Sequence, residues 1–108
     1  MELVKIVVFI PETHTEIVRK AMGDAVAGKM GNYSHCAFIT KGTGKFLPLV
    51  GAHPFIGEVG KTEEVSEDKL EMLCEKEKAK DVIAAIKKVH PYEEVAFDIF
   101  PELSEEEL

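Results

Sequence analysis

A nearly unbroken apolar run, Leu3 to Ile10, is the feature that most restricts how this chain can fold. The run is rich in β-branched residues and contains one charge, Lys5. Such a segment is typical of a strand in the middle of a sheet, covered on at least one face. Pro11 has no amide hydrogen to continue the ladder, so we expect the strand to end there.

An amphipathic helix is expected directly after this strand. Apolar residues recur at helical spacing over 17–26. Thr13 and Glu16 have the spacing of a capping box, in which each side chain satisfies a free amide at the helix start. Gly28 is the expected C-cap. The first part of the chain is therefore predicted to be a strand followed by a helix.

The last part of the chain repeats these two kinds of element. A strand is expected over 65–75, followed by an amphipathic helix over 78–89. One face of that strand carries Leu70, Met72 and Cys74. Pro91 ends the helix, and a final strand is expected over 95–100.

The middle of the chain is rich in turn-forming residues, because all eight glycines lie within 23–60. Aliphatic and aromatic residues are interleaved with them, which indicates turns and close backbone contacts rather than a linker. We expect a strand over 33–40, a hairpin turn at 41–44 and a short return strand over 46–50 that contains Pro48.

The order of elements predicts an α+β fold of the ferredoxin-like βαββαβ type, with an extra hairpin in the middle segment. Its antiparallel sheet would have both helices on one face. Residues 1–101 would form this single domain, and 102–108 an acidic C-terminal tail. Because apolar residues occur on both faces of several strands, we expect the uncovered face to be buried by self-association.

Charge and cysteine content exclude several classes of function. The net charge of -7 argues against nucleic acid as a partner, because phosphate contacts need clustered Lys and Arg. No apolar run approaches the ~18 residues that a bilayer span needs, and the first residues do not look like a signal peptide, so we expect no membrane partner. Two cysteines cannot form a disulfide framework, which indicates a reducing, cytoplasmic location.

Several blocks of the chain resemble a known family. They are Gly31-Asn32-Tyr33-Ser34-His35-Cys36-Ala37-Phe38, Gly42-Thr43-Gly44-Lys45-Phe46-Leu47-Pro48-Leu49 and Gly57-Glu58-Val59-Gly60-Lys61. They are similar to the central insert of the YqfO group in the NIF-three-like (NGG-one-interacting-factor-three-like) family. The stretch His90-Pro91-Tyr92-Glu93-Glu94 completes the pattern, and it also resembles the CutA family of divalent-cation-tolerance proteins.

This resemblance implies a CutA-like and PII-like fold and a homotrimer. Full-length members of the family carry the insert between two halves of a larger domain that binds two metal ions. In 108 residues those halves are not expected, so that dinuclear site is not carried over to this chain. The resemblance is to a free-standing version of the insert, which forms a trimeric lid in the full-length proteins.

A metal site is a separate question, raised by four histidines and two cysteines. No local spacing of these residues matches a zinc motif. His35 and Cys36 are neighbours on a predicted strand, so their side chains should point to opposite faces. A divalent ion held between chains would leave no such spacing. His35 and His90 are the candidate ligands for a divalent metal ion, and no other cofactor is predicted.

Candidate ligand-binding residues come from the glycine-rich segment and the stretch after the second helix. They are Asn32, Tyr33, His35, Gly42, Gly44, Lys45, Glu58, Tyr92 and Glu93. The turn at 42–45 could offer amides and an ammonium group to a phosphate, but it lacks the Ser or Thr and the helix of a P-loop. No catalytic residue is predicted, since adjacent Glu93 and Glu94 diverge in extended chain.

Three functions follow from these observations. The preferred one is a non-enzymatic trimeric binding or regulatory module, with a small ligand or protein partner at the clefts between subunits. The second is a lid or accessory component of a separately encoded metal-dependent hydrolase of the NIF-three-like family. The third is divalent metal-ion binding of the CutA type.

Overall fold

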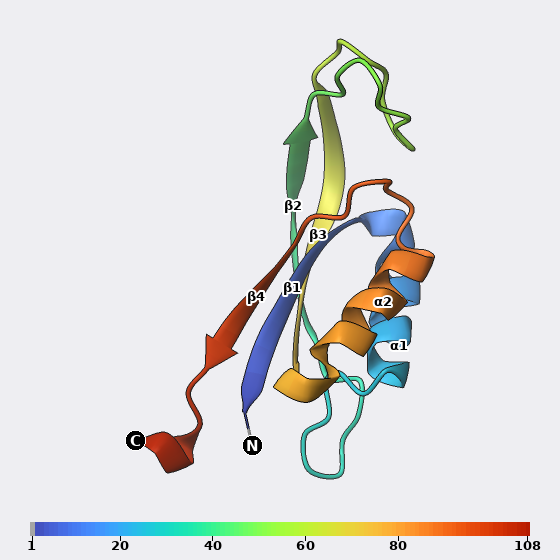
Figure 1. Cartoon of the computed structure of the whole chain (residues 1–108). Helices are drawn as coiled ribbons and strands as arrows, with labels where there is room; N and C mark the ends of the chain where they lie inside the picture. Colours follow the sequence, from blue (N-terminus) through green and yellow to red (C-terminus); the bar gives the residue numbers. More distant parts are fainter. Residues whose placement is uncertain (1) are drawn as a thin grey trace.

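A four-stranded antiparallel sheet with strand order β2-β3-β1-β4 forms the centre of the computed structural model, which describes residues 2–108 (Figure 1). The elements are β1 (Leu3–Pro11), α1 (Thr15–Asp24), β2 (Phe38–Phe46), β3 (Glu63–Glu75), α2 (Ala79–Val89) and β4 (Phe97–Glu102). Short 3-10 turns occupy Glu12–His14, Lys76–Lys78 and Glu105–Glu107. This is the predicted α+β order, with both helices on one face of the sheet.

The hydrophobic core lies between the sheet and the two helices. Alternate residues of β1 and β3 point into it, as the period of a strand requires. They are Val4, Ile6, Val8, Ile10, Leu70, Met72 and Cys74. Val18 and Met22 of α1 and Val82 and Ile86 of α2 cover them and are fully buried. The predicted inward face of β3 is therefore confirmed.

The extra hairpin predicted in the middle segment does not form. β2 runs without interruption from Phe38 to Phe46 and pairs with β3 along its whole length. The predicted turn at 41–44 lies inside this strand, and the predicted return strand at 46–50 belongs largely to the loop of residues 47–62. Gly44 lies inside this strand, and a Cβ there would overlap the carboxyl group of Glu67 on β3, so the missing side chain leaves room for that group.

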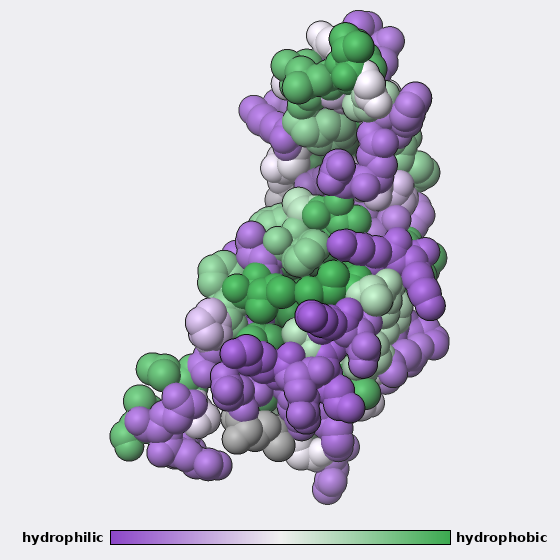
Figure 2. Space-filling model, viewed as in Figure 1, coloured by the Kyte–Doolittle hydropathy of each residue, from purple (hydrophilic) through white to green (hydrophobic). Residues whose placement is uncertain are grey.

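The β2–β3 pair continues beyond the end of β1 as a two-stranded arm. Pro11, the last residue of β1, is opposite Glu67, so residues 63–66 of β3 pair with β2 alone. The arm carries the 47–62 loop, which curves back toward the helical side (Figure 1). Exposed apolar side chains gather on this loop (Figure 2). They are Leu47, Leu49, Val50, Phe55 and Val59.

The ends of α1 also differ from the prediction. The capping box does not form, because Thr13 is in the 3-10 turn with its Oγ1 2.8 Å from His14 Nδ1, and Glu16 pairs with Arg19 instead. The helix ends at Asp24 and the chain then takes a left-handed conformation at Val26 (φ 80°). Among residues 2–108, no helix has the length and apolar character needed to cross a bilayer.

Candidate functional site

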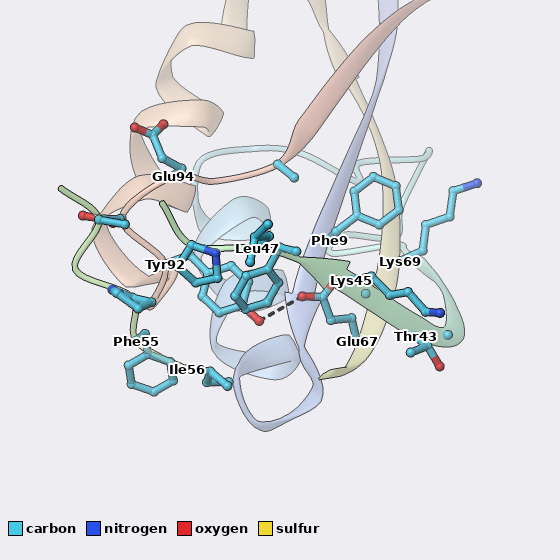
Figure 3. Close-up of a pocket in the computed structure, with 18 of the residues that line it drawn as sticks. Phe9, Thr43, Lys45, Leu47, Phe55, Ile56, Glu67, Lys69, Tyr92 and Glu94 are labelled. Atoms are coloured by element: carbon cyan, nitrogen blue, oxygen red, sulfur yellow. Dashed lines mark hydrogen bonds between the residues drawn. The ribbon is translucent and has the colours of Figure 1, made fainter. Parts of the chain in front are cut away.

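A cavity of about 840 Å³ opens between β2, the 47–62 loop and the segment that joins α2 to β4 (Figure 3). Its volume is within the range of small-molecule sites. Most of its walls are apolar. The larger apolar and aromatic side chains that line it are Phe9, Phe46, Leu47, Leu49, Phe55, Ile56 and Tyr92. Segments far apart in the sequence therefore meet to form one pocket.

His90 positions the chain segment after α2, which forms one wall of the pocket. It is buried, and its Nε2 donates a hydrogen bond to the carbonyl oxygen of Phe9 over 2.8 Å. Its Nδ1 accepts a hydrogen bond from the amide of Tyr92 at 3.2 Å, so the imidazole is neutral with its proton on Nε2. Burial lowers the pKa of His90, while the bond to Phe9 acts in the opposite direction. This side chain holds Tyr92 in place.

Tyr92 and Glu67 form the polar centre of the pocket. The Tyr92 hydroxyl donates to Glu67 Oε2 over 2.9 Å, as the dashed line in Figure 3 shows. The Tyr92 ring meets Phe46 edge-on, with ring centres 5.9 Å apart. Burial and the Glu67 carboxylate raise the pKa of the Tyr92 phenol well above its ordinary value. The phenol therefore remains a hydrogen-bond donor at neutral pH.

The 47–62 loop closes the pocket by two contacts with the rest of the domain. The amide of His53 donates to Glu93 Oε1 over 2.7 Å. Phe55 meets His14 edge-on, with ring centres 5.6 Å apart. Both contacts join the loop to segments at the helical side of the sheet. The loop therefore forms a wall of the pocket and does not extend freely into solvent.

Two lysines at the rim of the pocket are paired with acidic side chains outside it. Lys45 Nζ is 3.0 Å from Glu64, and Lys41 Nζ is 3.1 Å from the buried carboxylate of Asp68. Asp68 also accepts a hydrogen bond from Thr15 over 2.6 Å, which, with Lys41, lowers the pKa of its carboxyl group. This cluster ties β2 and β3 to the start of α1.

The structure brings together part of the predicted ligand-binding set. The pocket-lining members are Gly42, Gly44, Lys45, Tyr92 and Glu93. The two glycines are strand residues, so they do not form the phosphate-binding turn that the sequence suggested.

The other predicted residues lie outside the pocket lining. Asn32 is in an exposed turn closed by the backbone bridge between Met30 and Tyr33. Glu58 pairs with Lys61 over 2.9 Å within the 47–62 loop.

The two candidate metal ligands are at opposite ends of the domain. His90 contacts Phe9 near the end of β1, and both of its ring nitrogens are hydrogen-bonded. His35 contacts Asp24 at the end of α1, with Nε2 3.0 Å from the carboxylate. Among residues 2–108, no group of three or more His, Cys, Asp or Glu side chains could hold a metal ion. Divalent metal binding by His35 and His90 in an assembly of several chains stays a prediction.

Sequence reasoning missed Glu67, Phe9, Phe46 and Phe55 as pocket residues. Glu67 is one of many acidic residues in its strand, and only the pairing of β2 with β3 shows that its carboxyl group lies over Gly44. Alternation along 65–75 places Glu67 on the face opposite Leu70, which was the available signal.

No family model matches the chain. Curated relatives do match it. The chain is 54% identical over 99 residues to the GTP cyclohydrolase 1 type 2 homolog of Bacillus subtilis, which covers 92% of this chain and 26% of that protein. It is 46% identical over 99 residues to the protein of the same name from Mycobacterium tuberculosis, with the same coverage. The chain thus spans about a quarter of the length of the curated relatives it matches.

Solved structures give the same result. A Bacillus cereus protein related to NIF3 aligns with a TM-score of 0.83 and 47% identity over 95% of this chain and 26% of that one. The periplasmic divalent cation tolerance protein CutA from Archaeoglobus fulgidus aligns with a TM-score of 0.69 and 18% identity, over 96% of this chain and 89% of that chain. The second likeness shows the fold alone. The chain is a YqfO-type domain of the NIF-three-like family, with a CutA/PII-like fold.

Proposed function

We propose that this domain is a trimeric binding or regulatory module that holds a small ligand in the pocket around Tyr92. The observation that carries this proposal is the pocket itself, with mostly apolar walls and few convergent polar groups. Hydrogen bonds fix which atoms of its central groups carry protons, because the Tyr92 hydroxyl donates to Glu67 and both ring nitrogens of His90 already have partners. Such an arrangement suits binding better than proton transfer.

Self-association is supported by the face of the sheet that the helices leave open. Phe38 and Phe100 lie on that face and are 69% and 50% exposed. Lys5 on the same face is within ion-pair distance of Glu71 and Glu102. Aromatic groups among paired charges are a surface that further copies of the chain can cover.

The pocket and this open face are continuous, which supports a ligand site at a cleft between subunits. Phe9 and Lys69 are paired across β1 and β3 and line the pocket. In β1, Phe9 alternates with the core residues Val8 and Ile10, so it lies on the open face. A neighbouring subunit packed on that face would therefore approach the pocket rim.

Native mass spectrometry of the chain purified from its own host tests this function. We expect a trimer of about 36 kDa, three chains of 12.0 kDa, carrying the additional mass of a bound small molecule. A monomer would contradict the trimeric module. A trimer that carries no ligand and binds none from a metabolite extract would contradict the binding function.

A second candidate function is that of a lid on a separate metal-dependent hydrolase, and the exposed apolar loop favours it. Leu49 and Val50 on the 47–62 loop are 69% and 95% exposed. The test is size-exclusion chromatography of this chain mixed with the Bacillus subtilis relative from which the matching segment has been deleted. A lid would form a complex that Val50→Asp weakens, whereas separate elution of the two proteins would contradict this function.

A further inference from the structure

We propose that the pocket selects organic cations, in which an amine or amidine group on an apolar or aromatic body pairs with the Glu67 carboxylate. The inference rests on the proposed binding function and names the chemical class of its ligand. It follows from the charges around Glu67, from the geometry of its hydrogen bond and from the nature of the walls.

Glu67 is a half-buried carboxylate whose observed partner is a neutral group. Among residues 2–108, no Lys, Arg or His nitrogen lies within ion-pair distance of it, although several other acidic side chains of the domain have such a partner. Its observed partner is the neutral hydroxyl of Tyr92, at 2.9 Å from Oε2. A partly desolvated negative charge gains most from a partner of opposite charge.

The hydrogen bond from Tyr92 leaves Glu67 able to accept more. A carboxylate has about four acceptor positions on its two oxygens, and Tyr92 fills one of them. Because the pKa of Tyr92 is raised, the phenol keeps its proton and holds Oε2 in place rather than competing as an anion. Oε1, which lies over Gly44, can then accept N–H groups of a ligand.

The lysines around the pocket do not neutralise Glu67. Lys45 and Lys41 pair with Glu64 and Asp68. Figure 3 shows the ammonium ends of Lys45 and Lys69 pointing away from the Tyr92–Glu67 pair. The centre of the pocket is therefore negative, and an anionic ligand would be repelled there.

The walls around Glu67 suit the apolar part of such a ligand. Phe46 and Tyr92 contact each other beside the carboxylate, and Phe9 and Phe55 line the same cavity. Aromatic rings stabilise a nearby cation through their negative faces and also bury apolar surface. A cationic group on an aromatic body satisfies both features at once.

Three probes with one aromatic body and different charges test the inference. They are 2-naphthylmethylamine, 2-naphthylmethanol and 2-naphthoate, titrated into the full chain at pH 7 by isothermal calorimetry. We expect the amine to bind about tenfold or more tightly than the alcohol, and 2-naphthoate to bind most weakly. Glu67→Gln should remove the preference for the amine. The matched control is Glu64→Gln, since Glu64 is in the same strand and pairs with Lys45.

The outcomes separate the inference from the function on which it rests. Equal binding of all three probes, tightest binding of 2-naphthoate, or an amine preference that survives Glu67→Gln would each overturn the cation selectivity while leaving a binding pocket. Absence of binding by every probe at millimolar concentration would overturn the binding function itself. If Glu67→Gln does not fold, the ranking of the three probes on the unmodified chain still tests the cation selectivity of the pocket.

Discussion

The hydroxyl of Tyr92 donates a hydrogen bond to Glu67 Oε2 over 2.9 Å and thereby joins the segment after α2 to β3. These residues are 25 positions apart in the sequence. The bond sits where Gly44 leaves room for the Glu67 carboxyl group and where His90 fixes the backbone of Tyr92.

Titration of Tyr92 should begin at a higher pH than that of a free tyrosine. The phenol is buried beside a carboxylate, so its neutral form is favoured and its pKa is raised. Absorbance at 295 nm in a Tyr33→Phe background isolates Tyr92, because the chain has two tyrosines. Glu67→Gln should move the titration to lower pH. The contribution to stability is complete below the ordinary tyrosine pKa of about 10 and declines as pH rises above it. A free-tyrosine titration of Tyr92 in the Tyr33→Phe chain, with Glu67 intact, would contradict this contact.

Gly44→Ala should disturb the pocket, whereas Gly42→Ala should not. A Cβ at Gly44 would overlap the Glu67 carboxyl group, but at Gly42 the nearest atom is 4.0 Å away. We expect Gly44→Ala to lose the Tyr92–Glu67 bond and to be about 1 kcal/mol less stable than Gly42→Ala in urea unfolding. Equal stability of the two variants, with the same Tyr92 titration, would show that Glu67 does not depend on this space.

His90→Gln should destabilise the domain at pH 7 and reduce the effect of acid on stability. Loss of the imidazole bonds to Phe9 and Tyr92 should cost about 1–3 kcal/mol. The pKa of His90 is lowered in the folded state, so its contribution is present above the ordinary value of about 6.5 and is lost as pH falls through the folded pKa. Unfolding free energies at pH 7 and pH 5 should therefore differ less for the variant. An identical pH response of both proteins would contradict the neutral, buried state of His90.

Charges on the open face of the sheet should dissociate the assembly. Phe38→Glu and Phe100→Glu place a carboxylate at exposed aromatic positions that we expect to be covered by a second subunit. Native mass spectrometry should show a shift from about 36 kDa toward 12.0 kDa. Val50→Glu, at a 95% exposed loop position, is the control and should keep the trimer. Persistence of the trimer in both aromatic variants would place the interface elsewhere.

Local periodicity was enough to predict most of the fold. The apolar run of β1, the alternation along β3 and the amphipathic pattern of α2 each reflect interactions between residues close in sequence. Leu70, Met72 and Cys74 share one buried face, as their spacing indicates. The resemblance of the 31–61 segment to the NIF-three-like family also agreed with the curated relatives.

The pocket depends on contacts between distant residues, which local patterns do not contain. The glycines at 42 and 44 indicate a turn when the local sequence is read alone. The pairing of β2 with β3 shows instead that the space left by Gly44 is occupied by the side chain of Glu67, 23 positions away. The partners of Tyr92 and His90, Glu67 and Phe9, are likewise remote in sequence. The periodicity of side chains along the sequence predicts which face of a helix or strand is buried. Which elements contact each other is determined by strand register and by the contacts of the loops. The charge balance around Glu67 therefore became visible only in the folded chain.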